Sequence, residues 1–412
     1  MDGCDISLRY VRLGYLKLET INELLQSLYT QGILGPGYLV FLLRVRRSLS
    51  RNFSMWVARS GRPKSRSSYS AEQCRRAACE SDVFIRYSLV GIQKRSLVRQ
   101  VKKGFLLSRI LMFVREWQMY RAFQTAMTIH KPELVFILGD IFDEGLWCSS
   151  AEFDRYVARF NSLFYIPQNT QLYVVAGNHD MGFHYKIIPY LNQRFVNAMN
   201  APSVKRVSVR GNHFVLMNSM ALEGDGCFLC KPTEMALNRI AKQLKCTKGI
   251  GSSCKSKDIL KQYSKPILLQ HYPMYRESDE ICHEVDEAPA NIKSEKFRER
   301  WECLSKEASE QLLDIMEPRL IVNGHTHHGC RRIHRENILE FTVPSFSWRN
   351  KNNPSFLLGV FTPNNYSVSK CYMPVETTVI GIYIIGSIVV FLYLVLKARR
   401  GFNYRRLVKL HP

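Results

Sequence analysis

The stretch LVFILGDIFDEG, residues 134–145, joins a continuous apolar run to a turn that begins at Gly139 and Asp140. The same arrangement returns in residues 172–180, LYVVAGNHD, where an apolar run leads into a second glycine followed by polar residues. A short, uninterrupted apolar run bounded by a turn is typical of a strand that is buried on both faces. Both stretches therefore predict buried strands that end in polar turns.

Two later stretches repeat this pattern, ILLQH at residues 267–271 and LIVNGHTH at residues 320–327. Segments with helical spacing alternate with the strands, which favours a layered α/β architecture. We also expect strands near residues 214–218, 338–343 and 356–361, helices at 116–130, 151–164 and 305–316, and a first strand at 110–114.

Polar side chains follow four of the predicted strands at the point where each strand ends. In open α/β sheets, sites form beyond the carboxyl ends of the strands, so we expect these side chains to converge. Carboxylate, amide and imidazole donors suit Mn²⁺, Fe or Zn²⁺ better than Ca²⁺. The candidate metal ligands are Asp140, Asn178, His271, His325 and His327. A pair of such ions can hold both the attacking and the leaving oxygen of a phosphate ester.

The series GD, GNHD, an isolated histidine after a strand, and GHTH resembles the calcineurin-like metallophosphoesterases. The sequences around these motifs, including LLQHYPMYRESD and VPSFSWRNKNNPSF, resemble those of the branch of that family that remodels GPI anchors. The resemblance covers about residues 113–400. It implies a four-layer α/β/β/α sandwich, placed here at residues 105–372, and two divalent metal ions, most often Mn²⁺.

The resemblance also implies a ligand or catalytic role for individual residues of this sequence. Asp140 would bridge the two ions. Asn178, His271 and His325 would complete one metal site, and His327 would belong to the other. The resemblance further implies that His179 donates a proton to the leaving oxygen and that Asp180 orients His179.

The same resemblance implies a substrate and a place in the cell. The substrate would be the ethanolamine phosphate on the second mannose of a GPI glycan. The partners would be GPI-anchored proteins, with contacts to a cargo receptor as a further expectation. The catalytic domain would lie in the lumen of the early secretory pathway, at endoplasmic reticulum exit sites, the intermediate compartment and the Golgi.

One family motif is missing from this sequence. The family opens with Asp-x-His at the end of its first strand, and both residues bind the first metal. The expected first strand, residues 110–114, runs directly into Arg115 and Glu116, and no Asp-x-His precedes it. Two explanations stay open: a variant chain in which that segment was lost or replaced, or a natural pseudoenzyme that binds or sorts without catalysis.

The chain carries a second signal near its end, an uncharged apolar segment at residues 377–396. About 20 such residues match the thickness of a bilayer core, so we predict a transmembrane helix. Residues 397–412 are basic and, by the positive-inside rule, form a cytosolic tail. The domain before the helix would then be lumenal, in agreement with a glycosylation sequon at Asn365.

Residues 1–104 are basic and atypical of the family, and contribute to a net charge of +23. We expect this region to be largely disordered, and a lumenal location argues against nucleic acid as its partner. Of the chain's 12 cysteines, Cys227 and Cys230 are spaced C-x-x-C. A zinc knuckle needs a second close pair, and the sequence has none. Disulfides among some of these cysteines are the favoured interpretation.

Overall fold

The computed structural model describes residues 85–90, 105–251 and 253–408. The chain divides into two compact units, and every described residue belongs to the second, Val83–Pro412. The basic region at residues 1–104 therefore lies outside the described residues, except for one strand.

Two sheets form the centre of the described unit. The first has the strand order β11-β10-β1-β2-β3, and the second has the order β4-β5-β6-β7-β9-β8. The strands are β1 (Ile85–Val90), β2 (Leu134–Ile137), β3 (Gln171–Val174), β4 (Val204–Val209), β5 (Asn212–Met217), β6 (Ile267–Gln270), β7 (Leu320–Asn323), β8 (Cys330–His334), β9 (Ile338–Thr342), β10 (Ser355–Phe361) and β11 (Tyr366–Tyr372).

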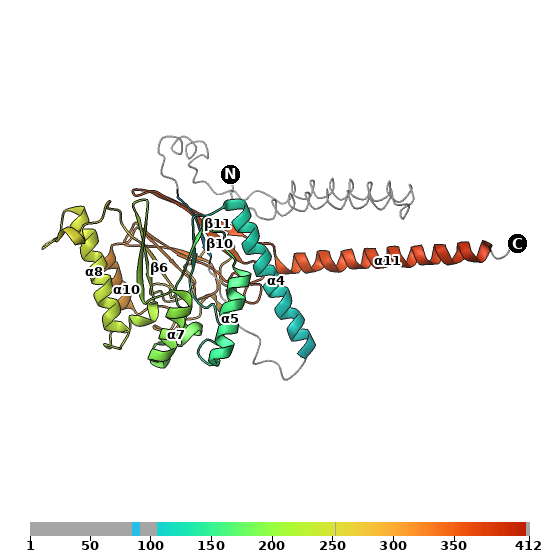
Figure 1. Ribbon diagram of the computed structural model, residues 1–412, viewed down its shortest axis with the longest axis horizontal. Coiled ribbons are helices and arrows are strands. Elements are labelled where there is room, and N and C mark those ends of the chain that lie inside the picture. Colours follow the sequence, from blue (N-terminus) through green and yellow to red (C-terminus); the bar gives the residue numbers. More distant parts are fainter. Residues whose placement is uncertain (1–84, 91–104, 252, 409–412) are drawn as a thin grey trace. The chain divides into compact units, whose positions relative to one another are not determined.

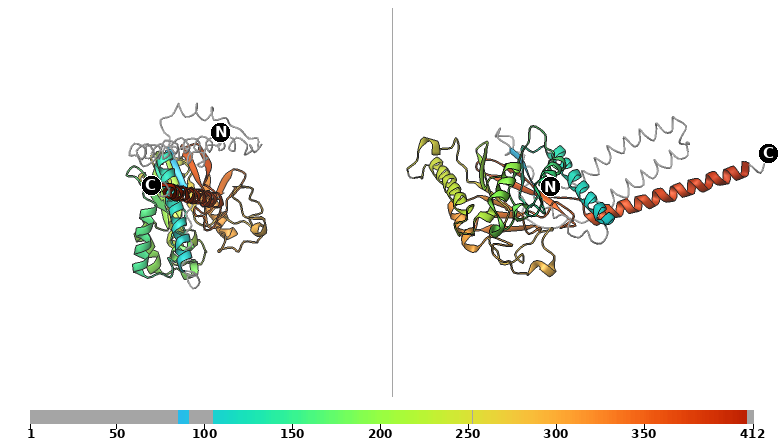
Figure 2. Two further views of the ribbon diagram at one scale, coloured as in Figure 1. Left: turned by 90° about the vertical axis from the view of Figure 1, so that its right-hand side faces the viewer. Right: turned by 60° about the horizontal axis from the view of Figure 1, so that its bottom comes forward.

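Helices cover the outer face of each sheet. Figures 1 and 2 show α4 and α5 beside the first sheet, with α8 and α10 on the far side of the second. The helices are α4 (Phe105–His130), α5 (Ser150–Leu163), α6 (Asn178–Met181), α7 (Pro189–Met199), α8 (Cys230–Lys248), α9 (Ala290–Lys293), α10 (Lys306–Met316) and α11 (Glu376–Val408), with the short 3₁₀ turns η2 (His184–Lys186), η3 (Ser219–Ala221) and η4 (Ser256–Asp258).

The core lies between the two sheets. Phe136 on β2 packs against Phe214 on β5, with ring centroids 5.0 Å apart, and Phe214 in turn contacts Phe361 on β10. All three rings are fully buried. Because each sheet buries one face against the other and one face under helices, the central strands are apolar throughout. This is the four-layer α/β/β/α sandwich that the sequence predicts.

Parallel pairing brings the ends of these strands to one edge. In the first sheet β1, β2 and β3 run parallel, with Ile137 opposite Val174. In the second sheet β5, β6, β7 and β9 run parallel. The polar turns that follow β2, β3, β6 and β7 therefore share one side of the sandwich.

The predicted first strand is wrong. Residues 110–114 lie inside α4, a helix of 26 residues. The strand beside β2 is β1, which pairs in parallel with β2 and antiparallel with β10. A short apolar run does not distinguish a strand from a buried helix, and here the longer helix prevails. The sheet thus includes residues that precede the expected domain start at 105.

Helix α11 follows the last strand and contains the predicted membrane segment. Its part Glu376–Arg399 is long and apolar enough to cross a membrane, and none of that segment is buried. The helix continues to Val408, so the first residues of the expected basic tail are helical. Figure 1 shows α11 as one continuous helix. The described residues also contain three disulfides: Cys227–Cys230, Cys246–Cys254 and Cys282–Cys330.

Candidate metal centre

Two glycines allow the turns after β2 and β3 to approach closely. Gly139 has φ +91°, and a Cβ added there would lie 2.6 Å from Nδ1 of His271. A Cβ on Gly177 would lie 2.3 Å from the backbone nitrogen of Asp140. No larger residue fits at either position, so both glycines are required for Asp140 to face the neighbouring turn.

The four turns bring four donor groups together. Nε2 of His271 lies 3.1 Å from Oδ1 of Asn178, 3.1 Å from Nδ1 of His325 and 3.3 Å from Oδ1 of Asp140. Donor atoms about 2.0–2.2 Å from one transition-metal ion stand about 3 Å from each other. The donor atoms of these four residues therefore lie close enough together to hold a single divalent cation.

The two imidazoles are held by the ring nitrogen that does not face the centre. Nδ1 of His271 lies 2.7 Å from the carbonyl of Leu138, and Nε2 of His325 lies 2.6 Å from the carbonyl of Trp301. A carbonyl accepts a proton, so each contact fixes the tautomer and leaves the other nitrogen as a lone-pair donor toward the centre. This is the usual arrangement of a metal-binding histidine.

The charge balance of the centre also favours a cation. Asp140 and Asp180 are both buried. Burial, followed by the charge of Asp140, raises the pKa of Asp180 to about 7. Burial and then the charge of His271 lower the pKa of His325 well below its usual value, which keeps this ligand neutral. Asp140 and Asp180 repel each other at this buried position, and a divalent ion beside them would relieve that repulsion.

His179 is oriented by Asp143 and not by Asp180. Nδ1 of His179 lies 3.6 Å from Oδ1 of Asp143 and 3.4 Å from its carbonyl oxygen. Asp180 instead accepts hydrogen bonds from the backbone amides of Phe142 and Gly177, both at 2.8 Å. Asp180 therefore fastens the two turns together. The orienting role that the resemblance implied for Asp180 is corrected on this geometry.

Two further residues support the centre, of which sequence reasoning missed Glu340 and considered Arg349 only for contact with the glycan or phosphate. Arg349 places Nη1 3.5 Å from Oδ2 of Asp143, so a cation stands behind the Asp143–His179 pair. Glu340, buried on β9, accepts from the amide of Met274 and from Nδ2 of Asn323, and so ties the turns after β6 and β7. Arg349 lies in the segment VPSFSWRNKNNPSF, whereas no motif points to Glu340, whose role follows only from its contacts in the folded chain. Trp348, beside Arg349, is buried, and its Nε1 donates to the carbonyl of Pro374 at 2.9 Å.

The second cation of the family does not fit the described residues. His327 has φ +66°, and its carbonyl accepts from the amide of Ser345. Its ring is not part of the close group formed by Asp140, His271 and His325. The segment after β1, residues 91–104, lies outside the described residues, and its sequence contains no Asp, Glu, His or Cys. We therefore derive no step through a second ion.

Comparison with known proteins agrees with this geometry. The family model described as calcineurin-like phosphoesterase matches residues 116–329. The chain belongs to this family. As a calcineurin-like phosphoesterase it acts on phosphate esters, and membership implies divalent metal ions. The match begins at Glu116, after the strand at which the missing motif would stand.

The calcineurin-like phosphoesterase is similar to several curated relatives named Metallophosphoesterase 1. The relative from Ailuropoda melanoleuca is 48% identical over 276 residues, which are 66% of this chain and 70% of that protein. The relative from Danio rerio is 44% identical over 280 residues, which are 68% of this chain and 74% of that protein. Among solved structures, a dimetal phosphatase from Danio rerio covers 70% of this chain and 98% of its own, at 13% identity and a TM-score of 0.41.

Proposed function

We propose that this chain is a membrane-anchored, metal-dependent phosphodiesterase that removes ethanolamine phosphate from the second mannose of GPI anchors. The observation that carries the proposal is the four-donor centre of Asp140, Asn178, His271 and His325, with His179 at its edge. The substrate rests on the resemblance of the segments around the motifs to enzymes that remodel GPI anchors. The curated relatives named Metallophosphoesterase 1 support the same branch of the family.

In this proposal, four residues of the centre bind the metal ion and His179 donates a proton. A divalent cation held by the four donors, Mn²⁺ by preference, would polarise a phosphoryl oxygen and lower the pKa of a water molecule. His179 keeps its Nδ1 toward Asp143, which leaves Nε2 to hold the proton that the leaving oxygen takes. The amide of His179 also donates to Oδ1 of Asp140, at 3.0 Å. This bond fixes the proton donor relative to the ligand.

The membrane helix suits a lipid-linked substrate. A GPI glycan stays close to a bilayer, and α11 would tether the domain to the same surface. The basic residues after Leu396 support a cytosolic tail by the positive-inside rule, and the domain would then lie in the lumen of the early secretory pathway. Asn365, in the turn between β10 and β11, is exposed and available for glycosylation in that compartment.

Glycosylation of Asn365 tests on which side of the membrane the domain lies. The full chain expressed in cells is expected to lose mass when treated with an enzyme that removes N-linked glycans, and Asn365→Gln is expected to abolish that shift. The sequence Asn-Phe-Ser at residues 52–54 is a second sequon, and Asn52→Gln is the matched control there. A chain whose mass does not change would place the domain on the cytosolic side.

Activity is tested with the purified full chain in detergent, supplied with Mn²⁺ and a GPI glycan that carries ethanolamine phosphate on its second mannose. Mass spectrometry would follow release of ethanolamine phosphate. Asp140→Asn is the inactive control, and a glycan with the group on the first mannose tests position. Turnover of a phosphopeptide or a nucleotide with the glycan left intact would show a phosphoesterase of different specificity.

The absence of ligands for a second cation favours one alternative, a chain that binds its glycan or cargo without turnover. Asp140 and His327 are the only expected ligands of that site in the sequence, whereas a catalytic metal usually has about three protein ligands. Binding of the intact glycan with no released product, under conditions in which a complete relative is active, would support this alternative.

A further inference from the structure

A second group of metal-binding side chains lies outside the phosphoesterase centre. His184, Asp225, Cys227 and Cys230 each place a donor atom within 4.8 Å of the others. His184 comes from η2, Asp225 and Cys227 come from the loop between η3 and α8, and Cys230 is the first residue of α8. The two segments are about 40 residues apart in the chain, so the sequence alone showed only the C-x-x-C pair.

His184 is oriented as a ligand. Its Nδ1 lies 2.9 Å from the carbonyl of Met220, which fixes the proton on that nitrogen. Its Nε2 lies 2.7 Å from Oδ2 of Asp225, so a proton lies between these two atoms, and Zn²⁺ would take the place of that proton. The side chain of His184 is 16% exposed, so packing restricts the ring while one edge stays open to solvent.

The loop holds Asp225 against the two cysteines. Gly224 and Gly226 have φ +78° and +70°, a conformation that favours glycine on both sides of Asp225. Oδ1 of Asp225 accepts from the amide of Cys227 at 3.1 Å and lies 3.3 Å from Sγ of Cys230. This carboxylate therefore reaches the histidine with one oxygen and the cysteines with the other.

Both sulfurs sit in surroundings that favour thiolates. Cys230 is the first residue of α8, a helix of 19 residues, and its amide donates to Sγ of Cys227 at 2.9 Å. A helix N-terminus and a backbone donor both stabilise negative charge on sulfur. The two free cysteines of the described residues differ from this pair: burial raises the pKa of Cys303 to about 11 and raises the pKa of Cys148.

We propose that His184, Asp225, Cys227 and Cys230 form a Zn²⁺ site that is separate from the phosphoesterase centre and is filled when the Cys227–Cys230 disulfide is reduced. Two thiolates, one imidazole and one carboxylate make a four-ligand set, and tetrahedral sites with sulfur and nitrogen donors select Zn²⁺. The loop thus has two exclusive states, a disulfide and a zinc dithiolate.

The change from the disulfide to the zinc dithiolate conserves electrons and protons. A dithiol reductant gives two electrons and two protons to the Cys227–Cys230 bond and becomes a disulfide itself. Zn²⁺ then binds both sulfurs and releases the two thiol protons to solvent. Oxidation reverses the sequence and expels the ion.

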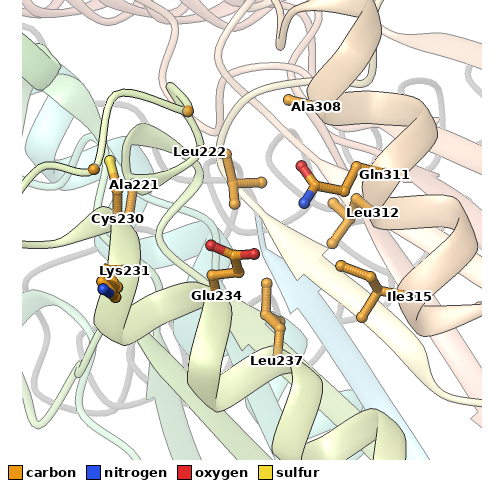
Figure 3. Close-up of a pocket in the computed structure, with 12 residues that line it drawn as sticks. Ala221, Leu222, Cys230, Lys231, Glu234, Leu237, Ala308, Gln311, Leu312 and Ile315 are labelled. Carbon is orange, nitrogen blue, oxygen red and sulfur yellow. The ribbon is translucent and has the colours of Figure 1, made fainter.

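The site would also brace the rim of the phosphoesterase centre. Tyr185, next to His184, lies with its ring 6.2 Å from that of Trp301, whose carbonyl holds His325. Cys230 lines one end of a cavity of about 220 Å³ between α8 and α10. Figure 3 shows Leu222 and Glu234 directed into that cavity from the same loop and helix. Zn²⁺ bound to this loop would therefore restrict both the edge of the phosphoesterase centre near Trp301 and the cavity between α8 and α10.

A third group of possible metal donors lacks the features of this site. Asp279, Cys282 and Cys330 are also close together, but all three are buried and Asp279 is paired with Arg276 at 2.8 Å. That group has no histidine and an arginine neutralises its carboxylate, so it makes a matched negative control.

The test uses the reduced full chain in detergent, titrated with Co²⁺ as a spectroscopic substitute for Zn²⁺. Cobalt bound to thiolate shows sulfur-to-metal charge-transfer absorption, which the sulfur-free phosphoesterase centre does not give. We expect this absorption in the wild type and in Asp140→Asn, and its displacement by one equivalent of Zn²⁺. It should be unchanged in Cys282→Ser with Cys330→Ser and absent in Cys227→Ser with Cys230→Ser.

The other two ligands are tested by affinity. His184→Ala and Asp225→Ala are each expected to weaken Zn²⁺ binding by at least ~10-fold, because even the outer partners of metal ligands contribute that much. Charge-transfer absorption that survives loss of Cys227 and Cys230, or that never appears in the reduced wild type, would overturn the proposal. So would an affinity unaffected by both His184→Ala and Asp225→Ala.

Discussion

Asp143 stands between a histidine and an arginine, and this position defines its role. Its carboxylate faces Nδ1 of His179 on one side and Nη1 of Arg349 on the other. Asp180, one residue after His179, is turned away to accept two backbone amides. The two carboxylates therefore have different roles: Asp143 orients the proton donor, and Asp180 joins two turns.

Substitutions at these two carboxylates should have different effects. His179→Ala is expected to lower kcat by about 10²–10⁴-fold, the usual contribution of a general acid, and Asp143→Asn to cause a smaller loss with unchanged metal content. Asp180→Asn should destabilise the fold by about 1–3 kcal/mol, because its NH₂ group cannot accept from both amides. Steady-state kinetics, metal analysis and thermal unfolding separate the outcomes. Equal kinetic losses at Asp143 and Asp180, without a change in stability, would contradict this division.

His328 predicts a dependence of stability on pH. Burial, followed by the charge of Lys351, lowers the pKa of His328 from 6.5 to about 4. The folded chain therefore binds fewer protons than the unfolded chain between these values, so this contribution is complete above pH 6.5 and is lost as the pH falls toward 4. His328→Gln, which can still accept from Nζ of Lys351, should flatten the fall of the unfolding temperature between pH 7 and pH 5.

The exposed His283 provides the matched control for that measurement. His283→Gln should leave the pH profile of the wild type intact. A profile that is just as steep in His328→Gln would show that other groups carry the pH dependence.

At the scale of elements, the connection between the turn after β6 and strand β8 depends on a covalent bond. The disulfide Cys282–Cys330 joins residues 48 apart and ends three residues after His327. The disulfide Cys246–Cys254 joins residues only 8 apart at the end of α8. A longer closed loop loses more entropy in the unfolded chain when it is cross-linked.

Removing each disulfide should follow this order. Replacing Cys282 and Cys330 by serine is expected to cost about 4 kcal/mol of unfolding free energy, and replacing Cys246 and Cys254 about 2–3 kcal/mol. Thermal or denaturant unfolding of the two double variants would measure the difference. A larger loss at the short loop would mean that local packing, and not loop closure, determines the contribution of these bonds.

Many individual elements follow from the sequence. The predicted strands at 134–138, 172–176 and 267–270 correspond to β2, β3 and β6, and the helix at 305–316 corresponds to α10. Uniform apolar runs and the serine cap at Ser305 are local signals. The first strand was misplaced because Ile85–Val90, IRYSLV, alternates with polar residues and does not look buried. Its partners β2 and β10 identify it only in the folded sheet.

At the scale of the whole molecule, the sheet order restricts where a second cation could bind. Strand β1 lies next to β2, so the segment after Val90 follows the strand beside the one that leads to Asp140. The sequence of that segment offers lysines and arginines in place of acidic or histidine ligands.

The full chain is therefore expected to hold about one divalent cation at the phosphoesterase centre, measured by mass spectrometry after oxidation with the Cys227–Cys230 bond intact. Asn178→Ala and His271→Ala should each reduce this content. Gly91→Asp combined with Gln93→His restores Asp-x-His directly after β1 and should raise the content toward two. Two cations in the unchanged chain would show that residues outside the motif complete the second site.

The sequence by itself determined the buried strands and the membrane segment, because apolar runs and an uncharged stretch of bilayer length are local patterns, and it predicted the candidate ligands from the polar turns that follow the strands. Tertiary structure alone decided that Asp143 orients His179, that Glu340 joins two turns, and that His184 meets Cys227 and Cys230. These contacts join residues far apart in the chain or lie within turns whose direction no local pattern sets. They exist only once two sheets have packed together and brought separate turns to one edge.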